Sequence, residues 1–146
     1  MKQPKLRLLL IGLVLLMAIP LIGSLATAGT VKIITNASNS VETVDDNLVK
    51  NIFLGKKKNW PNGDHAQFVV LSSGETHKSF LQTYVKKSSA QFKNYWKKQV
   101  FTGKGKNPKS FASEGEIVTY VTNTPGTIGY VSAGTDIGDA KVLSEK

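Results

Sequence analysis

The sequence predicts an α/β fold in which a central mixed sheet is flanked by helices. Runs rich in β-branched residues at 31–35, 68–71 and 127–131 alternate along the chain with segments whose apolar residues recur at helical spacing. The run at 68–71 is apolar throughout, which is typical of a strand covered on both faces. We see no internal repeat and no low-complexity linker, so residues 29–146 are expected to form one domain.

The first strand is expected over Val31–Thr35, where alternation gives way to β-branched residues. A helix should begin near Thr43 or Asp45 and end at Gly55, since acidic residues near a helix N-terminus are favourable. Its apolar face consists of Val44, Leu48, Ile52 and Phe53. Residues 56–64 read as a solvated surface turn, with its tryptophan folded back onto the core.

The second strand, Phe68–Leu71, runs through a polar turn into a second helix. The helical face comprises Phe80, Leu81, Tyr84 and Val85. Two interpretations of the turn remain open. Its hydroxyls, free N–H groups and the positive end of the helix dipole could hold an anion, or Ser73 or Thr76 could simply cap the helix.

A break at Ser88–Ala90 introduces a third helix, and Thr102–Lys109 follows as a basic, mobile loop without the spacing of a phosphate-binding loop. The apolar stripe of the third helix comprises Phe92, Tyr95, Trp96, Val100 and Phe101. We interpret it as a core stripe, the alternative being a stacking platform for sugars or bases.

A fourth helix is expected over Glu114–Val121, with Ser113 as a possible cap. Its buried side comprises Ile117, Val118 and Val121.

The last elements are a strand at Thr127–Val131 and a short strand near Lys141–Leu143. Gly129 stands where a strand side chain would be expected, which predicts the close approach of another backbone or of a ligand.

Residues 1–28 have the pattern of a secretory signal peptide: basic residues, an apolar run, and the small-x-small site Ala26–Ala28. The alternative is a retained membrane anchor, because the run approaches the ~20 residues that span a bilayer. With cleavage, no stable membrane anchor is expected. The chain has no cysteine, which excludes both disulfides and acylation at an N-terminal cysteine.

The formal charge is +9, of which residues 29–146 carry +6, and every basic residue there is a lysine. Lysine attracts anions as a point charge but lacks the two-pronged grip of arginine on phosphate. Because the lysines are scattered and the chain is expected to be exported, nucleic acid is not an expected partner.

Enzyme activity is not expected. Ser72 or Ser73 with His77 could in principle form a hydrolytic pair, but no Gly-x-Ser-x-Gly elbow surrounds the serines. His65 and His77 are the only histidines, and no carboxylate cluster accompanies them, so neither a metal site nor a cofactor is expected.

Several short motifs occur along the chain in the order found in one known protein family. They are Asn51–Gly55, Trp60–Gly63, Ser72–Gly74 with Phe80 beyond it, Trp96 with Phe101–Gly103, and Thr124–Val131. Over nearly the whole of residues 29–146 this pattern resembles the periplasmic phosphate-binding proteins of ABC transporters, most of all the short single-domain members. The resemblance implies a single lobe of the periplasmic binding protein type, located in the periplasm, that binds phosphate or a similar oxyanion without catalysis.

Family members hold the anion at a turn of the form Arg-x-x-x-Ser-Gly-Thr, to which Ser73 and Gly74 correspond. Glu75 stands at the Thr position, and the arginine has no match because Phe68–Leu71 is apolar. The ligand residues that the resemblance implies are Ser72, Ser73, Gly74 and Thr76, with Ser38 in the loop 35–38 as a further candidate. One lobe offers half a cleft, so a second subunit or an ABC permease is an expected partner. The alternative is an envelope structural or interaction module that keeps the fold and has lost the ligand.

Overall fold

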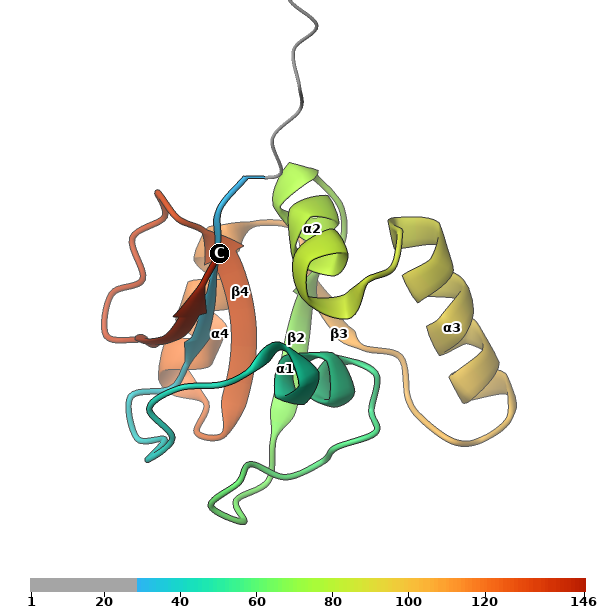
Figure 1. The fold of residues 1–146 in the computed structure, drawn as a ribbon, viewed down its shortest axis with the longest axis horizontal. Helices are drawn as coiled ribbons and strands as arrows, with labels where there is room; N and C mark the ends of the chain where they lie inside the picture. Colours follow the sequence, from blue (N-terminus) through green and yellow to red (C-terminus); the bar gives the residue numbers. More distant parts are fainter. Residues whose placement is uncertain (1–28) are drawn as a thin grey trace, which may run out of the picture.

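The computed structural model describes residues 29–146, which form a five-stranded sheet with helices on both faces (Figure 1). The predicted signal peptide lies outside the described residues. The strands are β1 (Val31–Thr35), β2 (Gln67–Leu71), β3 (Lys109–Phe111), β4 (Thr127–Ser132) and β5 (Lys141–Glu145). The helices are α1 (Asp46–Phe53), α2 (Glu75–Phe80), the π-helical turn η1 (Leu81–Val85), α3 (Ser89–Phe101) and α4 (Glu114–Asn123). None of these helices is long and apolar enough to cross a membrane.

The strand order β3-β2-β4-β1-β5 mixes parallel and antiparallel pairs, which confirms the predicted mixed sheet. β2 runs parallel to β3 and β4, whereas β1 runs antiparallel to β4 and β5. The carboxyl ends of β2, β3 and β4 therefore meet at one edge of the sheet, and the carboxyl end of β1 lies at the opposite edge. This arrangement decides which loops can share a site.

Successive residues of β4 show how the two faces are covered. A Cβ added to Gly129 would lie 2.9 Å from Cγ2 of Ile117 in α4, so the close neighbour is a helix side chain and not the backbone or ligand that we predicted. The next residue, Tyr130, points to the other face and stacks on Phe80 with ring centroids 3.8 Å apart. Thus α4 covers one face, and α1, α2 and η1 cover the other (Figure 1).

Helix starts follow the sequence closely. Asp45 caps α1 by accepting the N–H of Leu48 at 2.7 Å, and Ser113 forms a capping box with Glu116 at the start of α4. Ser88 caps α3 in the same way with Gln91. Trp60 is buried, as predicted.

Two predictions about the segment from 89 to 111 are wrong. The stripe on α3 buries Phe92 and Trp96, but Phe101 is 92% exposed and Val100 is 37% exposed. The five residues from Trp96 to Phe101 rotate the helix by about 140°, which carries Phe101 away from the core. The second error is strand β3, part of which was expected to be loop. Only three residues long, β3 is defined by its parallel pairing with β2, a tertiary contact that a short sequence cannot signal.

Candidate functional site

The turn Ser72–Gly74 lies at the carboxyl end of β2 and lines an open pocket of about 680 Å³. Four segments enclose this pocket: the end of β2 with its turn, the start of α2, one side of α3, and residues 107–110 before and within β3. Ser72 and Ser73 are both exposed. β3 lies beside β2 in the sheet, and residues of both α2 and α3 line the pocket.

The backbone of the turn presents unpaired donors. Ser72 donates its N–H to the carbonyl of Phe111 at 2.9 Å, which fixes the turn to β3. Gly74 adopts φ 104° and ψ 174°, a conformation almost confined to glycine, and starts the helix without a side-chain cap. Lys78 is the first helical residue whose N–H returns to the turn, 3.1 Å from the Gly74 oxygen. The N–H groups of residues 74–77 have no protein acceptor in the described part of the chain.

These donors begin a helical segment that continues from α2 into η1 without interruption, up to Val85. A cap by Ser73 or Thr76 is therefore not what the structure shows, since no side chain bonds to the helix start. Hydroxyls, free N–H groups and the dipole of this segment all lie at one end of the pocket, a combination that suits an anion.

His77 is buried in α2 but still lines the pocket. Its Nδ1 lies 2.5 Å from the hydroxyl of Tyr130, and that hydroxyl accepts the N–H of Leu71 at 2.9 Å. Burial raises the pKa of Tyr130 and lowers that of His77, so both side chains are neutral at pH 7. The phenol proton has no other acceptor among the described residues, so we assign it to Nδ1, which places the ring proton of His77 on Nε2.

Glu114, at the start of α4, accepts hydrogen bonds from residues of the neighbouring loop. Its carboxylate accepts the N–H of Ser132 at 2.5 Å and the hydroxyl of Thr135 at 2.9 Å. Burial by itself would raise the pKa of Glu114, but hydrogen bonds from Ser132, Thr135 and Thr76 lower it below its ordinary value. Thr76, one of the predicted ligand residues, therefore lies close to this internal anion.

Ser38 does not join this site. It follows β1 and therefore lies at the opposite edge of the sheet from the turn. Its hydroxyl donates to Oδ1 of Asn36 at 2.7 Å, and it lines a separate pocket with Trp60 and His65. The structure thus brings Ser72, Ser73 and Gly74 together, places Thr76 beside them, and separates Ser38 from all four.

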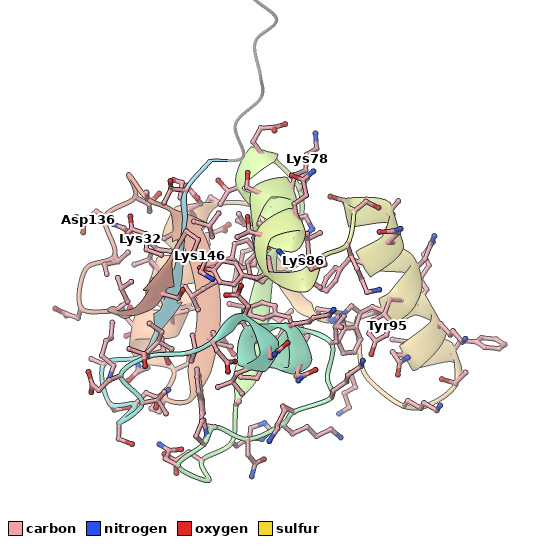
Figure 2. All side chains as sticks on the ribbon, viewed as in Figure 1. Lys32, Lys78, Lys86, Tyr95, Asp136 and Lys146 are labelled. Atoms are coloured by element: carbon pink, nitrogen blue, oxygen red, sulfur yellow. The ribbon has the colours of Figure 1, made fainter. Side chains whose placement is uncertain are left out.

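Charges around the pocket are mainly positive. Lys78 projects from α2 (Figure 2), and α3 adds Lys93 and Lys97; no carboxylate lines the pocket among the described residues. Glu75, the residue at the family's threonine position, forms an exposed ion pair with Lys78 at 3.1 Å. Nowhere in residues 29–146 do three or more His, Asp or Glu side chains cluster closely enough to hold a metal ion.

Sequence reasoning missed the roles of His77, Tyr130 and Glu114. Tyr130 carried a usable signal, because a tyrosine inside a buried strand needs a partner for its hydroxyl. Nothing in the sequence identified that partner, which lies 53 residues away.

Comparison with solved structures places the fold among phosphate-binding proteins of transporters. A protein of Clostridium perfringens, described as a phosphate ABC transporter substrate-binding protein with bound phosphate, superposes with a TM-score of 0.61 at 18% identity. PstS of Borrelia burgdorferi gives 0.60 at 17%, and an ABC-type phosphate transport receptor of Vibrio cholerae gives 0.55 at 16%. Each alignment covers 80% of this chain and 45 to 47% of the other, so the chain spans about half the length of these proteins.

No curated protein matches the chain. A family model described as the PBP superfamily domain matches residues 18–145, which is nearly all of the sequence. The family match and the shared fold lead to the same conclusion: this chain belongs to the PBP superfamily.

Proposed function

We propose that the chain is an exported, non-enzymatic solute-binding protein that holds phosphate or a similar oxyanion at the turn Ser72–Gly74. One observation carries the proposal: two exposed serines, next to the unpaired N–H groups at the start of the helix, line a pocket that contains lysines and, among the described residues, no carboxylate. The predicted signal peptide supports export to the periplasm. The similarity to phosphate-transport receptors supports a role in an ABC-type phosphate transport system.

The donor set favours a modest affinity. Hydrogen bonds to a charged group contribute about 1.5–3 kcal/mol each, so a few of them from Ser72, Ser73 and the backbone suffice for binding. Lysines add diffuse attraction that salt screens, because they are exposed and no arginine grips the anion. The exposed ion pair with Lys78 offsets the charge of Glu75.

A second subunit or a permease would complete the cleft. The pocket is open, and the chain spans less than half the length of the two-lobed relatives it resembles. Closing the open side would exclude water and strengthen each charge-assisted hydrogen bond.

Calorimetric titration of the full-length chain with phosphate at low ionic strength tests the proposal, with sulfate as a second anion. We expect saturable binding that weakens at least tenfold in a Ser72→Ala, Ser73→Ala double variant. Ser38→Ala is the matched control and should bind like the unmodified chain, because Ser38 lies at the opposite edge of the sheet. Absence of heat and of thermal stabilisation at millimolar phosphate would refute the proposal.

The second candidate function is an envelope interaction module without a ligand. Glu114 favours it, because this internal carboxylate already accepts hydrogen bonds from the hydroxyls of Ser132 and Thr135 near the carboxyl edge of the sheet. Phe101 favours it as well, since it stands 92% exposed at the end of α3. Cross-linking through a photoreactive residue at position 101 would identify a partner if phosphate fails to bind.

A further inference from the structure

The pocket is larger and more apolar than an inorganic anion needs. Besides the serine turn, its lining includes six apolar residues: Val70, Leu71, Ala90, Phe92, Trp96 and Pro108. Its volume of about 680 Å³ falls within the roughly 300–1,000 Å³ of sites for small organic molecules, which are also lined mainly by apolar and aromatic groups. A bare phosphate at the turn would leave this apolar lining facing water.

Two lysines of α3 line the pocket beside its aromatic residues. Lys93 and Lys97 follow Phe92 and Trp96 directly on α3, so each lysine flanks an aromatic ring at the pocket. Both lysines are exposed, and within residues 29–146 neither forms an ion pair. The pocket therefore combines an apolar surface with positive charge, which is complementary to a molecule that has an apolar body and an anionic group.

His77 supplies a further hydrogen-bond donor to the pocket. With Nδ1 accepting from Tyr130, its Nε2 carries a proton and has no partner in the described part of the chain. Nε2 is also not enclosed, because the one buried side-chain atom without a partner among the described residues is Oγ1 of Thr127. Since His77 lines the pocket, its Nε2–H is available to an acceptor on a ligand.

We propose that this site takes an organic phosphate monoester whose body is aromatic or otherwise apolar. The phosphate group lies at Ser72–Gly74, and the body packs against Phe92 and Trp96. This inference rests on the proposed oxyanion site and specifies its ligand class. Burying one aromatic ring against the apolar lining strengthens binding on the order of tenfold or more relative to inorganic phosphate.

Titration of the full-length chain with phenyl phosphate, inorganic phosphate and phenol, followed by calorimetry and by tryptophan fluorescence, tests the inference. We expect phenyl phosphate to bind at least tenfold more tightly than phosphate, and phenol to bind far more weakly than either. Phe92→Leu should weaken the binding of phenyl phosphate more than that of phosphate, and so reduce the preference between them. Its thermal melting midpoint confirms that the variant is folded.

A charge-reversal pair provides a test that does not touch the core. Lys97→Glu should weaken both phosphates, whereas Lys98→Glu, which changes the net charge equally on the same helix outside the pocket, should not. Phosphate binding as tight as that of phenyl phosphate would overturn this inference and leave the oxyanion site intact. Absence of binding by both phosphates would overturn the two together, and phenol binding as tightly as phenyl phosphate would overturn the requirement for an anionic group.

Discussion

Replacing Tyr130 by phenylalanine removes one oxygen atom that links β4 to β2 and α2. That oxygen accepts the N–H of Leu71 at 2.9 Å and donates to Nδ1 of His77 at 2.5 Å. A phenylalanine ring preserves the stack on Phe80, in which the ring planes differ by 4°. The substitution therefore isolates the hydrogen bonds from the packing.

The expected loss of stability is large because the groups that bond to the Tyr130 hydroxyl are buried. Tyr130 is 0% exposed and Leu71 is 4% exposed, so the N–H of Leu71 finds no water to replace the hydroxyl. A buried donor left unpaired costs about 1–3 kcal/mol, and Nδ1 of His77 loses its donor in the same variant. We expect the free energy of unfolding to fall by about 2–4 kcal/mol, a substantial part of the total stability of a small domain.

Equilibrium urea unfolding followed by circular dichroism measures this loss. Tyr120→Phe is the matched control: its hydroxyl accepts from Nε2 of Gln67 at 3.0 Å, but both side chains are only half-buried and can turn to water. We expect that control to lose no more than about 1 kcal/mol.

The pKa of His77, followed by NMR titration, gives a second measurement on Tyr130→Phe. Donation from the phenol to Nδ1 stabilises the neutral ring, so its removal should raise the pKa of His77 from its lowered value. A free energy of unfolding within about 0.5 kcal/mol of the unmodified chain, together with an unchanged pKa of His77, would refute the assigned network.

Three further predictions concern single residues. Gly129→Ala should lower the free energy of unfolding, measured in urea, by about 1–3 kcal/mol, because the added Cβ overlaps side chains of α4. Gly115→Ala is the control: its Cβ would meet open space, so the helix should be stabilised by up to about 1 kcal/mol. Gly74→Ala meets no neighbour within 4 Å, yet its φ of 104° should cost about 1–3 kcal/mol through backbone strain, measurable in the same assay. Burial lowers the pKa of His77 from its ordinary 6.5, so the unfolded chain binds more protons below that pH. Urea unfolding at several pH values should accordingly show stability falling as the pH drops below about 6.5, and this fall should be smaller in His77→Gln but persist in His65→Gln.

The chain's local patterns determined much of the fold. β-branched runs defined β1, β2 and β4, and hydroxyl or acidic residues marked the starts of α1, α3 and α4, because strand propensity and helix capping are properties of a few neighbouring residues. The turn Ser72–Gly74 was also recognisable as a strand-to-helix junction. The missing side chain at Gly129 signalled a close neighbour, but that neighbour is a side chain of α4 and not the predicted backbone or ligand.

Only the tertiary structure decided which groups share a site. Ser38 belonged to the candidate ligands until the antiparallel pairing of β1 placed it at the opposite edge of the sheet. His77 acquired its tautomer from Tyr130, 53 residues away, and Thr76 came to lie close to the carboxylate of Glu114. Capping and strand propensity act within a few residues, whereas strand direction and buried hydrogen bonds depend on segments that meet only when the sheet has assembled.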